Sequence, residues 1–161
     1  TLQAALQRAL ATPAAARAGM GAPEVVAAGD FTYVSTLGYF TPRLLPGAKV
    51  VDAPTVAQLM NSGAQYIDVR TEAEFKNGRV PGAVLVPYVE KSAKDTDYDA
   101  KLDSFDLAKL PADRSAALIF ACNGAECWKS YKASYRNVHW FRGGFPEWRS
   151  SADRRVASGA L

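Results

Sequence analysis

Cysteine and histidine are scarce in this chain of 161 residues, which contains two Cys and one His. Cys122, Cys127 and His139 cannot supply the four protein ligands of a structural zinc site, so we expect neither a metal centre nor a cofactor. A disulfide between two cysteines five positions apart would close a small ring and stabilise the fold little, because the entropic gain grows with loop length. The pair therefore favours a chemical role over an architectural one.

Long apolar runs and strong charge contrast are also missing. The longest strongly apolar run, Ala116–Ala121, is far shorter than the roughly 20 residues of a membrane span. The net charge is only +3, and the densest basic stretch, Arg149 to Arg155, is interrupted by Asp153. Nucleic-acid-binding surfaces need a more concentrated basic stripe. We therefore predict no membrane span and no nucleic-acid partner.

The composition is that of one globular domain. Hydrophobic residues make up 48% of the chain, but 29 residues are Ala, which leaves enough larger apolar side chains for one core and hardly for two. Charged residues make up 22%, close to the globular average, which excludes wholesale disorder. The length is also close to that of a single domain.

Residues 1–47 differ in character from the rest. Thr1–Ala11 places Leu at every fourth position and predicts a short amphipathic helix. An Ala-, Gly- and Pro-rich stretch follows over residues 12–29, and then an apolar segment over residues 31–40 without a clear period. We interpret residues 1–47 as an N-terminal arm packed on the main domain, with an arm that binds a protein partner as the alternative.

From Lys49 onward, strand and helix patterns alternate. The strand candidates are Lys49–Val51, Tyr66–Val69, Ala83–Val86, Ala116–Ala121 and Val138–Phe141. The helix candidates run from a cap at Asp52 or Thr55 to about Ser62, from a cap at Thr71 to Gly78, from Ser104 to Leu110, and from Trp128 to Tyr135. Such alternation predicts an α/β fold with a mostly parallel sheet and helices on both faces.

We place this domain at residues 48–155 and a tail at residues 156–161. We interpret Glu90–Lys109 as a solvated excursion, with a docking site as the alternative.

The loop that starts at Cys122 contains the residues that indicate a chemical function. It follows the most hydrophobic strand candidate and precedes a helix candidate, and ligands of open α/β sheets bind beyond the carboxyl ends of strands. A cysteine there faces main-chain amides and the positive end of a helix dipole, so we expect its pKa to fall below the free value of about 8.5. Gly124 lets the backbone curl, and Lys129 adds a positive charge.

Neighbouring motifs strengthen this signal. The segments DVR at 68–70, EF at 74–75, GRVPGA at 78–83, Pro87 and RGGFPEW at 142–148 follow one another in the chain. Together they resemble the pattern DVR…EF…GHIPGA…P…GG…W of rhodanese-like domains over about residues 49–151. The resemblance implies a central, mostly parallel five-stranded sheet with helices on both faces, extended at its N-terminus by residues 1–47.

The resemblance also implies a sulfurtransferase. In this family the cysteine at the strand end takes a sulfane sulfur from a donor such as thiosulfate, becomes a persulfide, and passes the sulfur to a thiol or another nucleophile. On this mapping Cys122 is the nucleophile, while Asp68 and Arg70 give structural support. The substrate would contact the loop residues Asn123, Gly124, Ala125, Glu126, Trp128 and Lys129.

Two departures from the family pattern leave alternatives open. Many relatives carry Arg where this chain has Cys127, and Trp128 cannot bind an oxyanion as the Arg of Cys-x5-Arg phosphatases and arsenate reductases does, so we expect no phosphatase. The Cys-x4-Cys-Trp spacing is similar to that of exported rhodanese-like proteins with Cys-x-x-Cys-Trp. Cys127 is then either a second catalytic thiol, which attacks the persulfide and leaves a disulfide, or a spectator.

The rival functions are a dithiol redox protein or sulfur relay that uses both cysteines, and an inactive binding module. We expect Trp128 to anchor its helix more than to bind substrate, and we expect His139 and Trp148 to be structural. The Ala-rich start without an initiator Met and the resembled subgroup favour an exported, periplasmic protein over a cytoplasmic one.

Overall fold

The computed structural model describes residues 25–28, 31–34, 39–43, 45, 48–113, 115–124, 127–133, 138–151 and 155–160. The helix predicted over Thr1–Ala11 and the loop residues Ala125 and Glu126 lie outside these ranges. Three strands precede the main domain: β1 (Val25–Ala28), β2 (Phe31–Val34) and β3 (Tyr39–Pro42) pair antiparallel in the order β1-β2-β3. Two of these strands, β2 and β3, account for the apolar segment whose period was unclear.

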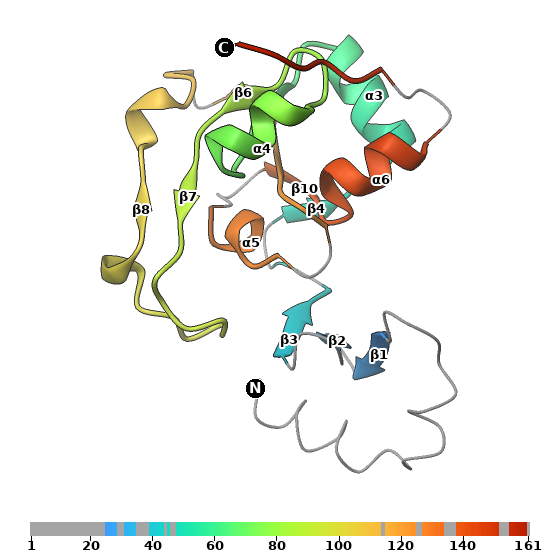
Figure 1. Cartoon of the computed structure of the whole chain (residues 1–161). Coiled ribbons are helices and arrows are strands. Elements are labelled where there is room, and N and C mark those ends of the chain that lie inside the picture. Colours follow the sequence, from blue (N-terminus) through green and yellow to red (C-terminus); the bar gives the residue numbers. More distant parts are fainter. Residues whose placement is uncertain are drawn as a thin grey trace.

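A five-stranded sheet forms the centre of the domain (Figure 1). Its order is β4-β10-β9-β5-β6, and every pair of neighbours is parallel. The predicted fold class is thereby confirmed, with the sheet all-parallel. The strands are β4 (Ala48–Val50), β5 (Gln65–Asp68), β6 (Val84–Leu85), β9 (Leu118–Ala121) and β10 (Val138–Phe141).

Helix starts agree with the predicted caps. Asp52 caps α3 (Ala53–Asn61), where its carboxylate accepts a hydrogen bond of 3.0 Å from the Thr55 amide. Thr71 and Glu74 form a reciprocal capping box at the start of α4 (Glu72–Asn77), and Gly78 ends that helix. Two further α-helices of the described residues are α5 (Lys129–Ala133) and α6 (Gly144–Ser150).

Alternating side chains of the central strands build a core on each face of the sheet. Tyr66 and Ile119 face one core, which α3 and α6 complete through Val56, Phe145 and Trp148. The next residue of each strand, Ile67 and Phe120, faces the other core, to which α5 contributes Ala133. Helices therefore cover both faces, as predicted, and the second core also contains Cys122.

The segment between β6 and β9 differs from its prediction. The helix predicted over Ser104–Leu110 is wrong: β8 (Ser104–Phe105) pairs antiparallel with β7 (Tyr88–Val89), and only one 3-10 turn, η2 (Leu107–Lys109), follows. The rings of Phe105 and Tyr88 pack with their centroids 5.4 Å apart, and the Asp106 carboxylate caps the short turn. Tertiary packing of one aromatic residue therefore overrides the local helical pattern.

Residues beyond α6 return to α4. Ala157 exchanges main-chain hydrogen bonds with Arg79, and the Gly159 amide donates to the Lys76 carbonyl oxygen at 2.8 Å. The domain boundary predicted at residue 155 stays a prediction. Among the described residues, no helix has both the length and the apolar character needed to cross a bilayer.

Candidate functional site

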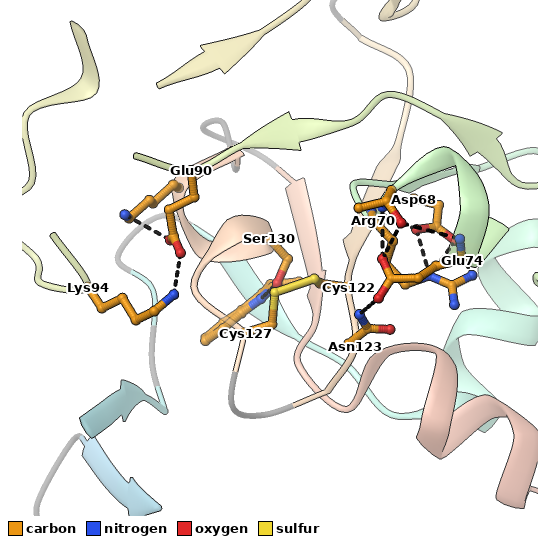
Figure 2. Close-up of a disulfide and its surroundings, with 12 residues drawn as sticks. Asp68, Arg70, Glu74, Glu90, Lys94, Cys122, Asn123, Cys127 and Ser130 are labelled. Atoms are coloured by element: carbon orange, nitrogen blue, oxygen red, sulfur yellow. Dashed lines mark hydrogen bonds and ion pairs between the residues drawn. A yellow bond between two sulfur atoms is a disulfide. The ribbon is translucent and has the colours of Figure 1, made fainter. Parts of the chain in front are cut away.

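Cys122 follows directly after β9, the middle strand of the sheet, and is bonded to Cys127 in a disulfide (Figure 2). The two Cα atoms lie 6.3 Å apart, within the range expected for bridged cysteines. The side chain of Cys122 is only 2% exposed, because it packs in the second core with Val69, Val86 and Tyr88. Cys127 is partly exposed. The bond demonstrates that the loop brings both sulfur atoms into reaction distance.

Main-chain hydrogen bonds and close packing hold the loop in a tight curve. Gly124 has a φ of +113°, so the predicted need for glycine is confirmed, and its carbonyl oxygen accepts from the Cys127 amide at 3.1 Å. The Phe145 amide at the start of α6 donates to the Cys122 carbonyl oxygen at 3.0 Å. Gly144 lies so close that a Cβ there would be 2.2 Å from that same oxygen. The start of α6 therefore fixes the position of Cys122.

The predicted ring of amides around a Cys122 thiolate is not displayed by the disulfide form. In this form the two sulfur atoms are bonded to each other, so Cys122 carries no thiolate. Two of the predicted substrate-binding positions, Ala125 and Glu126, fall outside the described residues. The lowered pKa of Cys122 concerns the dithiol form and stays a prediction.

Glu74 is a site residue that the sequence reasoning missed. Its Oε1 accepts a hydrogen bond of 2.5 Å from the side-chain amide of Asn123, while its Oε2 accepts from the Thr71 amide and hydroxyl. Burial opposes ionisation of Glu74, but hydrogen bonds from Thr71 and Asn123 and the charge of Lys129 lower its pKa below the ordinary 4.5. Glu74 thus ties the residue after Cys122 to α4. The capping-box spacing was the available signal, but it pointed to helix capping alone.

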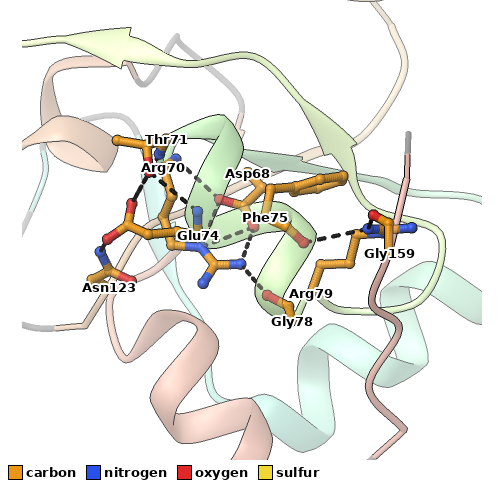
Figure 3. Close-up of polar contacts among 9 residues, drawn as sticks. All are labelled: Asp68, Arg70, Thr71, Glu74, Phe75, Gly78, Arg79, Asn123 and Gly159. Atoms are coloured by element: carbon orange, nitrogen blue, oxygen red, sulfur yellow. Dashed lines mark hydrogen bonds and ion pairs between the residues drawn. The ribbon is translucent and has the colours of Figure 1, made fainter.

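Asp68 and Arg70 form a buried ion pair, as their predicted supporting role requires. Their side chains are 1% and 3% exposed, and Arg70 donates from Nε and Nη2 to the carboxylate at 2.8 to 3.1 Å. Nη2 also donates to the Gly78 carbonyl oxygen at 2.7 Å (Figure 3). The guanidinium lies 4.3 Å from the centroid of the Phe145 ring. The pair therefore joins β5, α4 and α6 beneath the loop.

Aromatic residues near the site are structural. Trp128 is fully buried and packs edge-on against Tyr131, an environment that suits the expected anchoring role. Its place among the substrate-binding residues stays a prediction. Trp148 lies in the core, as expected. His139 was expected to be a satisfied structural residue, but its Nδ1 is buried and bonds to no described residue. Burial and the Lys49 charge lower the His139 pKa below 6.5.

The excursion between β7 and β9 is mostly exposed, as predicted for a solvated segment, but a few of its side chains form a buried ionic cluster. Lys132 of α5 has a fully buried ammonium group that lies 2.9 Å from a carboxylate oxygen of Glu90 and 3.9 Å from Asp103. The ammonium also donates to the Ser92 hydroxyl at 2.7 Å. Asp103 also accepts hydrogen bonds from Tyr88, Lys91 and Ser92. The charge of Lys132 therefore holds α5, the helix that follows the disulfide, against the excursion. No cluster of metal ligands occurs among the described residues.

Comparison with known proteins agrees with this geometry. The family model described as Rhodanese-like domain matches residues 52–151. The chain is 27% identical over 114 residues to the Arabidopsis thaliana protein HIGH ARSENIC CONTENT 1, mitochondrial, an alignment that covers 66% of this chain and 65% of that protein.

Comparison with solved structures supports the same fold through one of them. A thiosulfate sulfurtransferase from Pseudomonas aeruginosa superposes with a TM-score of 0.51 at 18% identity, over 71% of this chain and 21% of that one. The BH2092 protein from Bacillus halodurans has a TM-score of 0.49 at 20% identity, over 69% of this chain and 77% of that one. The chain thus spans about two thirds of the plant protein and one fifth of the Pseudomonas enzyme.

Proposed function

The chain belongs to the rhodanese-like domain family, and from this membership we propose that it is a sulfurtransferase in which Cys122 carries the sulfane sulfur. The observation that supports the proposal most is the position of Cys122 at the carboxyl end of the middle strand, bonded to a second cysteine of the same loop. Ligands bind at this edge of open α/β sheets, and a thiolate is the nucleophile of sulfur exchange.

The proposed reaction starts from the dithiol form. The Cys122 thiolate attacks the outer sulfur of a thiosulfate-like donor, the sulfur–sulfur bond of the donor breaks, and sulfite leaves with the electron pair. An acceptor thiolate then attacks the outer sulfur of the Cys122 persulfide and regenerates the Cys122 thiolate. Lys129, which follows Trp128 at the start of α5, would place its positive charge beside the donor anion.

Cys127 provides a second way to release the sulfur carried by the Cys122 persulfide. If the Cys127 thiolate attacks the inner sulfur on Cys122, hydrosulfide leaves and the disulfide forms; the two thiolates supply the two electrons that reduce the sulfane sulfur. The Cys122–Cys127 bond supports this step, because it requires the two sulfur atoms to meet. An external dithiol, oxidised in turn to its disulfide, would restore the starting form.

Mass spectrometry of single-cysteine variants tests the proposal. After reduction and treatment with thiosulfate, Cys127→Ser should gain about 32 Da, one sulfur atom, and should transfer sulfur to cyanide. Cys122→Ser is the matched control, since it keeps one thiol in the same loop, and it should gain nothing. Equal behaviour of the two variants would refute the assignment of Cys122.

The same disulfide favours a second candidate, a dithiol–disulfide relay that handles no sulfane sulfur. This candidate predicts reversible loss of about 2 Da on mild oxidation of the wild type and no persulfide in either variant. A Cys127→Ser protein that turns over thiosulfate normally would contradict it.

A further inference from the structure

The two cysteines of the disulfide differ in their surroundings. Cys122 is 2% exposed and lies in the second core together with Val69, Val86 and Tyr88. Cys127 is partly exposed and packs against that core from outside. A reagent dissolved in water therefore contacts Cys127, and not Cys122, while the bond is intact.

Neighbours outside the loop keep Cys122 buried. The residue follows β9 directly, and the Phe145 amide at the start of α6 donates to its carbonyl oxygen at 3.0 Å. A Cβ on Gly144 would be 2.2 Å from the same oxygen, so α6 packs directly on the main chain of Cys122. The main chain is thus held between β9 and α6, and the side chain stays in the core.

We propose that the thiol that reduces this disulfide attacks the sulfur of Cys127, so that Cys127 binds the reductant and Cys122 is the leaving group. The inference rests on the proposed function in one respect, namely that the reduced form is the one that turns over. A reductant thiolate bonds to Cys127 Sγ, the Cys122–Cys127 bond breaks, and Cys122 keeps the electron pair as a thiolate. A second reductant thiolate then attacks the reductant sulfur of the mixed disulfide and displaces Cys127 as a thiolate, so that the reductant is oxidised to its own disulfide.

The leaving group has an opposite effect, which access outweighs. Cys122 leaves as a thiolate among apolar side chains, and apolar surroundings disfavour this charge and slow its departure. Slow departure lowers the rate of attack at Cys127. A sulfur that no reagent contacts, in contrast, does not react at all until the loop opens. Access therefore decides the route in the folded protein.

Attack at Cys127 also delivers Cys122 in the form that the proposed function needs. Cys122 is released as a thiolate, the nucleophile of sulfur exchange, and it loses the atom that covered one side of its sulfur. Attack at Cys122 would instead leave that sulfur blocked by the reductant until the second step.

Trapping with glutathione locates the attacked sulfur. The wild-type disulfide protein is mixed with reduced glutathione, quenched after short times with excess N-ethylmaleimide, and digested with trypsin. Both cysteines lie in one tryptic peptide, residues 115–129, and fragment ions that end between them assign the two labels. Peptides with glutathione on Cys127 and maleimide on Cys122 should exceed the reverse pattern at least about tenfold. An even distribution, or an excess of glutathione on Cys122, would overturn the inference.

The rate of reduction gives a second readout, which needs no captured intermediate. Attack on an accessible sulfur is second order, so the rate should rise in proportion to the glutathione concentration. If the loop had to open first, the rate would level off at the rate of opening, and such a plateau would overturn the inference.

A pair of valine variants tests access to Cys122 directly. Val86→Ala removes packing from the core that contains Cys122, and it should change the reduction rate by less than about twofold, because the attack takes place at Cys127. Val84→Ala, at a position that is 37% exposed, is the matched control. A rate raised several-fold by Val86→Ala alone would show that the reductant reaches Cys122 and would overturn the inference.

These measurements involve no sulfane sulfur, so the two proposals fail separately. Glutathione bound mainly to Cys122 would overturn this inference and leave persulfide formation at Cys122 supported. Trapping on Cys127, in a protein whose Cys122 takes up no sulfur from thiosulfate, would refute the proposed function and leave this inference supported.

Discussion

Glu74 links two functions at the scale of a single residue, because one carboxylate caps α4 and holds Asn123 beside the disulfide. Glu72, two positions earlier, is an exposed member of an i,i+4 ion pair with Lys76. We expect Glu74→Ala to lower the free energy of unfolding by about 1–2 kcal/mol, since a cap and a side-chain hydrogen bond are lost together.

Glu72→Ala is the matched control and should change stability by less than about 0.5 kcal/mol, because exposed ion pairs contribute little. Urea unfolding of both variants measures the difference. Equal effects would show that the Asn123 contact does not stabilise the native state.

Gly144 permits the close approach of α6 to the cysteine loop. It has a φ of +58°, and a Cβ there would meet the Cys122 carbonyl oxygen and the Gly124 amide. Gly63 also has a positive φ, +96°, but a Cβ there would meet nothing. Gly63→Ala should therefore cost roughly 1–2 kcal/mol of backbone strain, and Gly144→Ala roughly 3 kcal/mol or more, because it adds a clash with backbone.

Sulfur transfer gives a second measurement for this pair. Because the clash would displace Cys122, Gly144→Ala should also slow persulfide formation in the fraction that folds, while Gly63→Ala should not. Equal stabilities and equal rates in the two variants would contradict the packing argument.

At the scale of elements, the buried charge of Lys132 fastens α5 to the excursion that carries β7 and β8. Lys94 pairs with the same carboxylate, Glu90, but its side chain is 43% exposed. We expect Lys132→Met to destabilise the protein by about 3–5 kcal/mol, because it leaves buried carboxylates without their cation. Lys94→Met should cost at most about 1 kcal/mol. Chemical unfolding measures the free energy of unfolding of both variants. Similar losses in Lys132→Met and Lys94→Met would refute the claim that burial makes the Lys132 ion pair important for stability.

The dependence of stability on pH in the acidic range measures the contribution of Asp103 to the same cluster. Burial opposes ionisation of Asp103, but hydrogen bonds from Ser92, Tyr88 and Lys91 hold its pKa well below the ordinary 3.8. A lowered native pKa contributes stability that is fully present above the unfolded value and is lost as the pH falls through the native one. The stability difference between wild type and Asp103→Asn should therefore shrink between about pH 5 and pH 2. A difference independent of pH would mean that the Asp103 charge does not matter.

Local signals predicted those elements whose boundaries depend on neighbouring residues. The caps at Asp52 and Thr71 fixed two helix starts, and the apolar run 116–121 predicted the middle strand. Contacts between segments distant in sequence escaped prediction. Phe105 becomes a strand residue because it meets Tyr88, and Lys132 is buried because Glu90 and Asp103 reach it. The charges of Lys132, Glu90 and Asp103 favoured exposure to solvent, because the ion pairs that permit their burial join segments distant in sequence.

At the scale of the whole molecule, the proposed function requires that the fold survive without the disulfide. The Cys122–Cys127 bond spans only five positions, and loop-closure entropy for so small a ring amounts to about 2 kcal/mol. Most of the stability must then come from the two cores, which hold Cys122 in place through Val69 and Val86 whether or not it is bonded. The dithiol form should remain folded and be the form that accepts sulfur.

Reduction with a phosphine should accordingly lower the free energy of unfolding by no more than about 2 kcal/mol and leave the circular dichroism spectrum unchanged. The same reduction should raise the rate of sulfur transfer from thiosulfate at least about tenfold, because the disulfide form has no thiolate. A Cys122→Ser/Cys127→Ser double variant is the control for stability, and its stability should match that of the reduced protein within about 0.5 kcal/mol. Global unfolding on reduction would show that the Cys122–Cys127 bond is structural. A protein that needs this bond to stay folded could not use the same two sulfur atoms for exchange.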